Sequence, residues 1–293
     1  MGDKMEDRKM TDSELTAELG KLKTISLVAT VFVYLLGALM IVMFITGNTV
    51  PAFVLLVLAF VAGWFKISSD KRIKKLTGDN LMSSILTDTF GEYKYLPHGH
   101  LSVDAVKSAG LDLPEFNEAG GSDYLKAVWK GLPIELSNIQ LDLADSIIDA
   151  DGNNQERRQN IFTGVWMICD TGKKSEAGVR VTERSKPGKG GIRTENEEFN
   201  ARFNVASESE LEAFRVLTPH MMERIMKVSG GADKLHISFL ADGKVHIALE
   251  GKQFFGLGKG APDASKLREK FTSELGGLTG IIDELGLCER KDG

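Results

Sequence analysis

The stretch Ile25–Thr46 reads ISLVATVFVYLLGALMIVMFIT and contains no charged side chain. At ~1.5 Å of rise per residue, an α-helix of this length crosses a hydrocarbon core of ~30 Å. A second uncharged run, Val50–Phe65 (VPAFVLLVLAFVAGWF), is shorter, so spanning requires local thinning of the bilayer or a snorkelling Lys66. Between the runs, Gly47-Asn48-Thr49 has the composition of a turn. The sequence therefore predicts a transmembrane helical hairpin over residues 25–67.

Two other structures have the same composition as this hairpin. A signal peptide fits poorly for three reasons. The first apolar run is longer than an h-region, it begins only after a 24-residue N-terminal segment, and a second apolar run follows it directly. A helical hairpin buried in a soluble core is the other alternative, and the residues alone leave it open.

Orientation is predicted from the basic residues that flank the two runs. No Lys or Arg lies between the runs, whereas both outer flanks are rich in them. Cytoplasmic segments carry the excess of Lys and Arg in membrane proteins, so both termini are expected in the cytoplasm. The flanking residues are Lys4, Arg8, Lys9, Lys21, Lys23, Lys66, Lys71, Arg72, Lys74 and Lys75.

Composition excludes several classes of protein. The chain has 293 residues and a formal net charge of -5, which is unlike the basic footprint of a nucleic-acid binder. Its two cysteines, Cys169 and Cys288, form no C-x-x-C pair, which excludes a zinc ribbon or a thioredoxin-type motif. No cofactor is predicted.

The chain outside the hairpin divides into four parts. Residues 1–24 form a cytosolic N-terminal segment, and residues 68–90 an amphipathic juxtamembrane stalk, with apolar side chains at near-helical spacing. Residues 91–262 are expected to form a cytosolic α+β domain with a mainly antiparallel sheet and packed helices. Residues 263–293 form a C-terminal amphipathic helix and tail, in which Leu275 and Leu278 lie at the centre of the apolar stripe. Because Gly276, Gly277 and Gly280 weaken this helix, we expect it to be docked and not free.

Alternating apolar residues predict most of the strands. Tyr124–Trp129 and Leu132–Leu143 flank a Lys130-Gly131 turn. The apolar phase changes between Leu136 and Ile139, which predicts a β-bulge near Ser137-Asn138. Further strands are expected at Ile161–Cys169, Ala177–Glu183 and 199–205.

A hairpin is predicted at Leu235–Leu249, and its register follows from its apolar residues. Only a three-residue loop, Ala241-Asp242-Gly243, pairs Phe239 with Val245 and places the apolar residues of both strands on one face. This loop requires Gly243 in the left-handed conformation. His236 and His246 would then lie on the outward face.

Short motifs supply only weak candidate sites. His98 and His100 are candidate metal ligands, although no third ligand is evident, and a loop before a helix capped by Ser102 is the simpler interpretation. Asp149–Asn153 resembles the start of a calcium loop but lacks the glycine and glutamate that such a loop requires. Gly256–Gly260 and the basic loop Lys186–Arg193 are interpreted as a linker and a solvated loop, with lipid headgroups as an alternative neighbour of the basic loop.

The segment Glu198–Arg224, EFNARFNVASESELEAFRVLTPHMMER, resembles a bacterial family of uncharacterised membrane proteins. That family carries a domain of unknown function, sometimes mislabelled galanin. The resemblance rests on Phe203, Val205, Ser207, Glu212, Ala213, Leu217, Thr218, Pro219, Met222, Glu223 and Arg224. Shorter likenesses are Gly99-His100, Lys130–Ser137, Phe162–Gly164 and Ile237–Phe239, so the resemblance covers roughly residues 70–255. The arginine of the family pattern is Phe214 here, with Arg215 one place later.

This resemblance implies a two-helix membrane protein with a C-terminal domain of no established activity. Members of the family often accompany LemA-type membrane proteins, which implies such a partner, with self-association as the alternative. The predicted function is a membrane-anchored cytosolic interaction or scaffold module in a bacterial inner or plasma membrane. The competing hypothesis is a membrane-associated enzyme, a hydrolase, that uses the His98 and His100 region. A pocket joining two histidines and a carboxylate would favour the enzyme, and an exposed apolar groove would favour binding.

Overall fold

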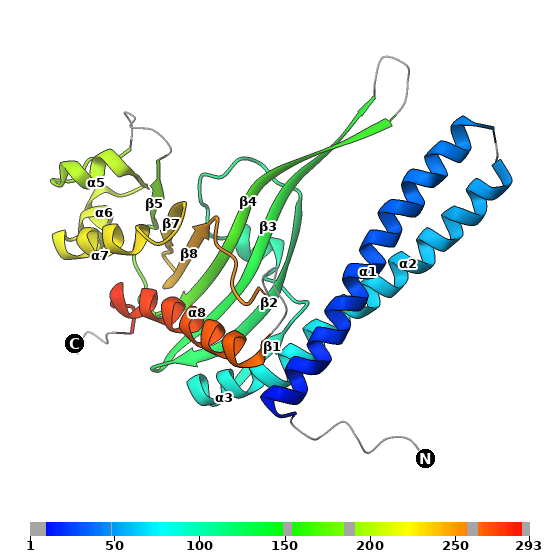
Figure 1. Ribbon diagram of the computed structural model, residues 1–293. Coiled ribbons are helices and arrows are strands. Elements are labelled where there is room, and N and C mark those ends of the chain that lie inside the picture. The colour runs from blue at the N-terminus through cyan, green and yellow to red at the C-terminus, as the bar shows by residue number, and fades with distance from the viewer. Residues whose placement is uncertain (1–9, 48, 149–153, 185–190, 257–262, 289–293) are drawn as a thin grey trace. The chain divides into compact units, whose positions relative to one another are not determined.

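A computed structural model describes residues 10–47, 49–148, 154–184, 191–256 and 263–288 of the chain (Figure 1). The chain divides into two compact units. The first comprises Met1–Thr89 and Leu257–Thr272, and the second comprises Phe90–Gly256 and Ser273–Gly293.

Two long apolar helices, α1 (Asp12–Ile45) and α2 (Thr49–Thr77), dominate the first unit. Helix α1 begins before the apolar run, because Thr11 and Glu14 form a reciprocal capping box at its N-terminus. It ends where Gly47 takes a positive φ of 78°, a conformation that glycine adopts without steric cost.

Among the described residues, these two helices are long and apolar enough to cross a membrane. Only 6% of the most apolar window in each helix is buried within the structure. A core helix of a soluble fold buries its apolar side chains, so a soluble-core hairpin does not describe α1 and α2.

The polar ends of the two helices form a small helical core with three other segments. The π-helix η1 (Gly78–Met82) and α3 (Ser83–Phe90) continue the chain after α2, and the first turns of α8 (Ala264–Glu284) join them. Arg268 donates to Asp12 and to Ser84, at 2.8 Å and 3.3 Å. The buried apolar side chains of this core are Leu15, Leu19, Leu22, Ile73, Leu81, Met82, Ile85, Leu86, Leu267 and Phe271.

An eight-stranded antiparallel sheet forms the second unit as far as the structure describes it, which makes the fold α+β, as predicted. The strands lie in the order β1-β2-β3-β4-β8-β7-β5-β6. Their bounds are β1 (Tyr93–Leu96), β2 (Glu118–Trp129), β3 (Leu132–Ile148), β4 (Asn154–Asp170), β5 (Val179–Glu183), β6 (Phe203–Ser207), β7 (Lys234–Phe239) and β8 (Lys244–Glu250). The short helices are α4 (Val103–Lys107), α5 (Glu197–Arg202), α6 (Glu210–Val216) and α7 (Pro219–Ser229).

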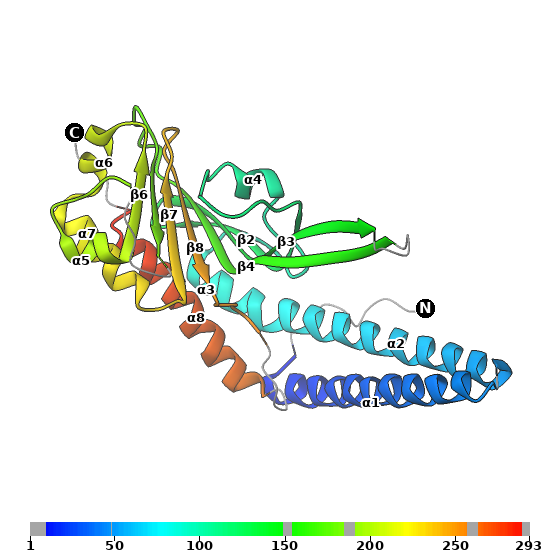
Figure 2. The same cartoon turned by 90° about the horizontal axis from the view of Figure 1, so that it is seen from above.

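A bulge does lie opposite Ser137, as predicted, but it is not on β3, because β3 pairs with β4 without interruption from Ile134 to Leu141. The extra residue lies on the neighbouring strand β2, where Ser122 pairs with Asn138 and Leu125 pairs with Leu136. The apolar phase of β3 changes for another reason: both faces of the sheet are buried. Figures 1 and 2 show the second half of α8 on one face and α4 on the other.

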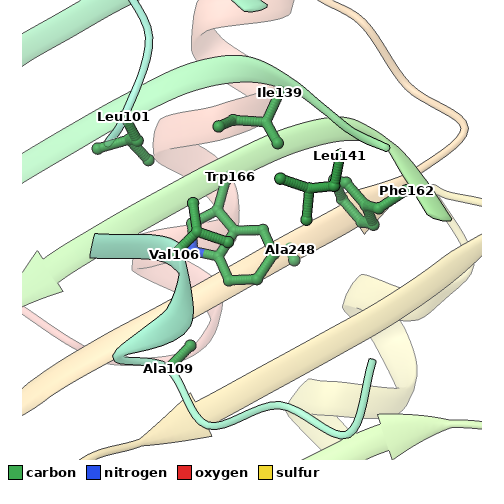
Figure 3. Packing of buried hydrophobic residues seen from close by; sticks show 8 residues of the cluster. All are labelled: Leu101, Val106, Ala109, Ile139, Leu141, Phe162, Trp166 and Ala248. Atoms are coloured by element: carbon green, nitrogen blue, oxygen red, sulfur yellow. The ribbon is translucent and has the colours of Figure 1, made fainter. Parts of the chain in front are cut away.

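The face beneath α4 carries its own apolar core (Figure 3). The indole of Trp166 lies against Val106 of α4, and Ile139 and Leu141 of β3 flank it. The remaining members of this cluster are Leu101, Ala109, Phe162 and Ala248. A strand between two cores needs apolar residues on both faces, which explains the sequence pattern of β3 and β4.

The predicted hairpin register of β7 and β8 is confirmed. Phe239 pairs with Val245 and Ile237 with Ile247. Gly243 has a φ of 97°, and its N–H donates to the carbonyl of Leu240 at 3.1 Å.

The prediction of a strand from residue 199 is wrong for its first part. Residues 197–202 form α5, because the side chain of Asn196 caps the N–H of Phe199 and two acidic residues occupy the first turn. Within this turn Phe199 remains buried and stacks on Phe203, with ring centroids 4.7 Å apart. One helical turn therefore buries Phe199 together with Phe203, whereas Ala201, which an alternating strand would also bury, is exposed.

The C-terminal helix is docked, as predicted. Its stripe of Leu275, Leu278, Ile282 and Leu285 is buried within the second unit. The turn after the helix also packs, since Leu287 is buried.

Candidate ligand-binding cleft

A cleft of about 410 Å³ lies in the second unit between α7, α8 and the segment that follows β8. Its volume falls in the range of ~300–1,000 Å³ that is typical of ligand sites. The residues that line it are Lys227, Val228, Gly231, Leu249, Lys252, Phe254, Ser273, Glu274, Gly277, Gly280, Ile281 and Glu284.

Small residues leave room along one wall of the cleft. Helix α8 lines this wall with Ser273, Gly277 and Gly280, and the larger side chains of Glu274, Ile281 and Glu284 lie beside them. A Cβ added to Gly277 or Gly280 would meet no atom within 4 Å, so the space beside them is open. Leu249 and Val228, both buried, supply an apolar floor.

Charged side chains line the rim of the cleft, and three of them have partners. Lys227 forms an ion pair with Glu284, which joins α7 to the end of α8. A carboxylate oxygen of Glu274 accepts the backbone N–H of Phe255 at 2.7 Å. Lys252 is exposed and forms no hydrogen bond or ion pair with the residues that the structure describes.

A buried polar network holds the wall that carries Phe254. The amide of Asn138 donates to the carbonyl of Phe254 at 2.8 Å and accepts its N–H at 2.9 Å. Asn138 also donates to Asp123, the bulge residue of β2 with a φ of 62°. Asp123 in turn accepts the hydroxyl of Tyr95 at 2.7 Å, and burial raises the pKa of that tyrosine. The bulge thus positions a carboxylate that orders the cleft wall.

His98 and His100 take no part in this cleft. His98 is exposed, and Nδ1 of His100 lies 2.8 Å from the carbonyl of Leu101. No group of three potential metal ligands gathers anywhere in the described ranges. The loop leads into α4, whose N-cap Ser102 accepts the N–H of Ala105 at 3.2 Å, as the simpler interpretation predicts.

His236 and His246 are buried, which corrects the expectation that they lie on an outward face. They belong to the face that the chain around α4 covers, where the indole N–H of Trp166 donates to Nδ1 of His246 at 3.2 Å. Burial lowers the pKa of His246 to about 4 and also lowers the pKa of His236. The nearby Ser238 hydroxyl donates to the carbonyl of Ala109 and not to a histidine. Ser238 and the two histidines are therefore buried core residues and do not form a nucleophile with its base.

The residues that carry the family resemblance shape the strand β6 and the helices α6 and α7, and of these elements only α7 lines the cleft. Ser207 accepts the N–H of Ser209, and Thr218 caps α7, which begins at Pro219. Glu212 is 1% exposed and accepts Arg215 at 2.8 Å, whereas Phe214 is exposed. Phe203 and Leu217 are buried. A carboxylate oxygen of Glu223 lies 3.9 Å from Nδ1 of His220, and the side chain of Arg224 also has an interaction partner.

Three loops singled out in the sequence lie wholly or partly outside the described residues. These are Asp149–Asn153, most of Gly256–Gly260 and the first part of Lys186–Arg193. In the described end of the basic loop, Ile192 donates to the carbonyl of Val205, and Arg193 pairs with Glu197.

The cleft was not predicted from the sequence. Gly277 and Gly280 were the signal for it, beyond their effect of weakening the helix. Glycines inside a helix that also has a regular apolar stripe indicate a face on which side chains are absent for packing or for function.

Comparison with known proteins supports a domain whose activity is not established. No curated protein and no solved structure shows significant similarity to the chain. Residues 160–287, from β4 to the turn after α8, match the model of a family described as "Protein of unknown function (DUF3137)". Every residue that lines the cleft lies within this matched region.

Proposed function

We propose that this chain is a membrane-anchored binding module whose C-terminal domain faces the cytosol and takes a ligand in the cleft. The observation that carries the proposal is a preformed apolar cleft with few, rim-placed polar groups. Clefts of this composition bind ligands by burying their apolar surface and orient them with a few polar contacts.

The apolar helices α1 and α2 support the anchor. Large side chains such as Leu27, Phe53 and Phe60 are more than half exposed. In water this surface would be strongly unfavourable, whereas in a bilayer it meets lipid. The basic flanks support a cytoplasmic location for both ends of the hairpin under the positive-inside rule.

The chemistry of the cleft favours binding over hydrolysis. Its described polar side chains are two lysines, two glutamates and Ser273, without histidine or cysteine. A serine nucleophile requires a base within hydrogen-bond reach, and the carboxylate of the adjacent Glu274 already accepts the N–H of Phe255.

We also propose that the helical hairpin packs against another membrane protein. The exposed faces of α1 and α2 offer surface against which a LemA-type membrane protein would pack, with a second copy of this chain as the other outcome of a cross-linking test.

The test of cleft binding is photo-cross-linking in intact cells from a benzoyl-phenylalanine placed at Gln253, beside Lys252 and Phe254 on the rim. We expect an adduct that is lost when Gly277→Leu fills the cleft and retained in Gly276→Leu, a matched change on the same helix outside the cleft. An adduct that Gly277→Leu leaves unchanged would not come from the cleft and would contradict the proposal, as would the absence of any adduct.

A further inference from the structure

The shape of the cleft limits what it accepts. It follows α8 from Ser273 to Glu284, which spans ~16 Å at ~1.5 Å per residue. The wall formed by Gly277 and Gly280 presents helix backbone, whose N–H and C=O groups are already paired within the helix. The opposite side presents Val228, Leu249 and Phe254. An elongated apolar cleft of this kind suits a slim chain.

The lining also discriminates against a peptide. Every peptide unit brings an N–H and a C=O that must find partners when buried. Along its floor the cleft offers apolar side chains, and its polar groups lie at the rim. A hydrocarbon chain has no polar group to leave unpaired, so its burial is favourable along the whole length of the cleft.

The charge of the rim indicates the head group. Lys227 is balanced by Glu284, and Glu274 is bound to the N–H of Phe255. Lys252 is the rim ion without a partner among the described residues. An anionic head would form an ion pair with this ammonium group, whereas a neutral head would accept only a weaker hydrogen bond and a cationic head would be repelled.

From these observations we propose that the cleft binds a single-chain anionic amphiphile, an acyl chain that ends in a carboxylate or phosphate. The inference rests on the proposed function and names the ligand class of the same site. The acyl chain lies along the glycine wall, and Lys252 pairs with the head. A bilayer supplies such molecules as free fatty acids or lysophospholipids, and the two sources share this chemistry.

The test uses the full chain in phosphatidylcholine nanodiscs with a diazirine-bearing palmitate, and mass spectrometry to map the adducts. We expect adducts on the cleft residues Phe254 and Ile281. Gly277→Leu and Gly280→Leu fill the cleft without displacing an atom within 4 Å of the new Cβ and should abolish these adducts. Gly276→Leu, which is equally unobstructed but lies outside the lining, should retain them.

The head group is tested with a diazirine-bearing hexadecanol of the same chain length. We expect about tenfold more cleft adduct from palmitate than from hexadecanol, because one charge-assisted contact is worth about this factor. Lys252→Gln should remove that preference, and Lys244→Gln, a charge change outside the cleft, should keep it. A photoreactive lysophosphatidylglycerol in the same assay distinguishes a lipid phosphate from a free carboxylate.

The following outcomes would overturn the ligand class. Adducts confined to α1 and α2, or unchanged in Gly277→Leu, would show that palmitate labels only lipid-facing surface. Equal labelling by hexadecanol would exclude the anionic head. A peptide captured from Gln253 in cells, with no cleft adduct from palmitate, would refute the amphiphile and leave the binding function standing, whereas no cleft adduct in either assay would refute both.

Discussion

At the scale of single residues, Gly243 has the conformation that its hairpin requires. Its φ of 97° is unfavourable for any residue with a Cβ, and a Cβ there would lie 2.8 Å from the backbone nitrogen of Lys173. We expect Gly243→Ala to lower the free energy of unfolding by about 1 kcal/mol or more. Chemical denaturation of the full chain measures this change. Gly120→Ala, with open space and ordinary φ, is the control, and an equal effect of both changes would contradict the argument.

A second prediction at this scale concerns how His246 makes the stability of the fold depend on pH. Burial lowers the pKa of His246 to about 4, against an ordinary value near 6.5. As the pH falls below about 6.5, the unfolded chain binds this proton before the folded chain does, so stability is lost between about pH 6.5 and pH 4. The full loss from this residue is of the order of 3 kcal/mol.

The variant His246→Asn isolates this effect. Its side-chain oxygen can accept the indole N–H of Trp166 in place of Nδ1, but the residue does not titrate. We expect the free energy of unfolding of the variant to fall less steeply between pH 6.5 and pH 4 than that of the wild type. Parallel pH profiles would assign the acid sensitivity to other groups.

At the scale of elements, α8 persists because tertiary contacts bury it. Three glycines make an isolated helix of this sequence weak, yet Leu275 and Leu278 are almost fully buried. We expect Leu275→Ala to lower the unfolding free energy by about 2–5 kcal/mol, since it leaves a cavity in the core. The exposed Ser273→Ala on the same helix should change it little, and thermal unfolding followed by circular dichroism compares the two.

Strand β3 shows how an element responds to its neighbours. Its apolar phase changes where the sheet is covered on both faces, and the regular pairing of residues 134–141 with β4 shows that no residue is inserted there. The bulge belongs to β2, where Asp123 is turned into the polar network that holds Asn138 and the cleft wall. A local irregularity in one strand thus orders a loop distant in sequence.

At the scale of the whole molecule, the anchor and the domain must share one side of the membrane if the basic flanks determine topology. We expect a cysteine at Asn48 to react with an impermeant maleimide outside intact cells, and a cysteine at Asp263 to be protected until the cells are opened. Cys169 and Cys288 are first replaced, because both are free thiols. External labelling at Asp263 would refute the predicted orientation.

The sequence by itself determined the features that depend on local composition and period. The uncharged runs predicted α1 and α2. The requirement that the apolar residues of β7 and β8 lie on the same face of the sheet determined the register of this hairpin. A slip of one residue would move the apolar residues of one strand to the opposite face. These inferences hold because the physical cause lies within a few neighbouring residues.

Only the tertiary structure decided what covers each surface. Whether His236 and His246 face water depends on the distant segment around α4, and the change of phase in β3 depends on two separate layers. The cleft itself is formed by α7, α8 and the end of β8, brought together by long-range packing, and a space between elements leaves no periodic signal in any one of them.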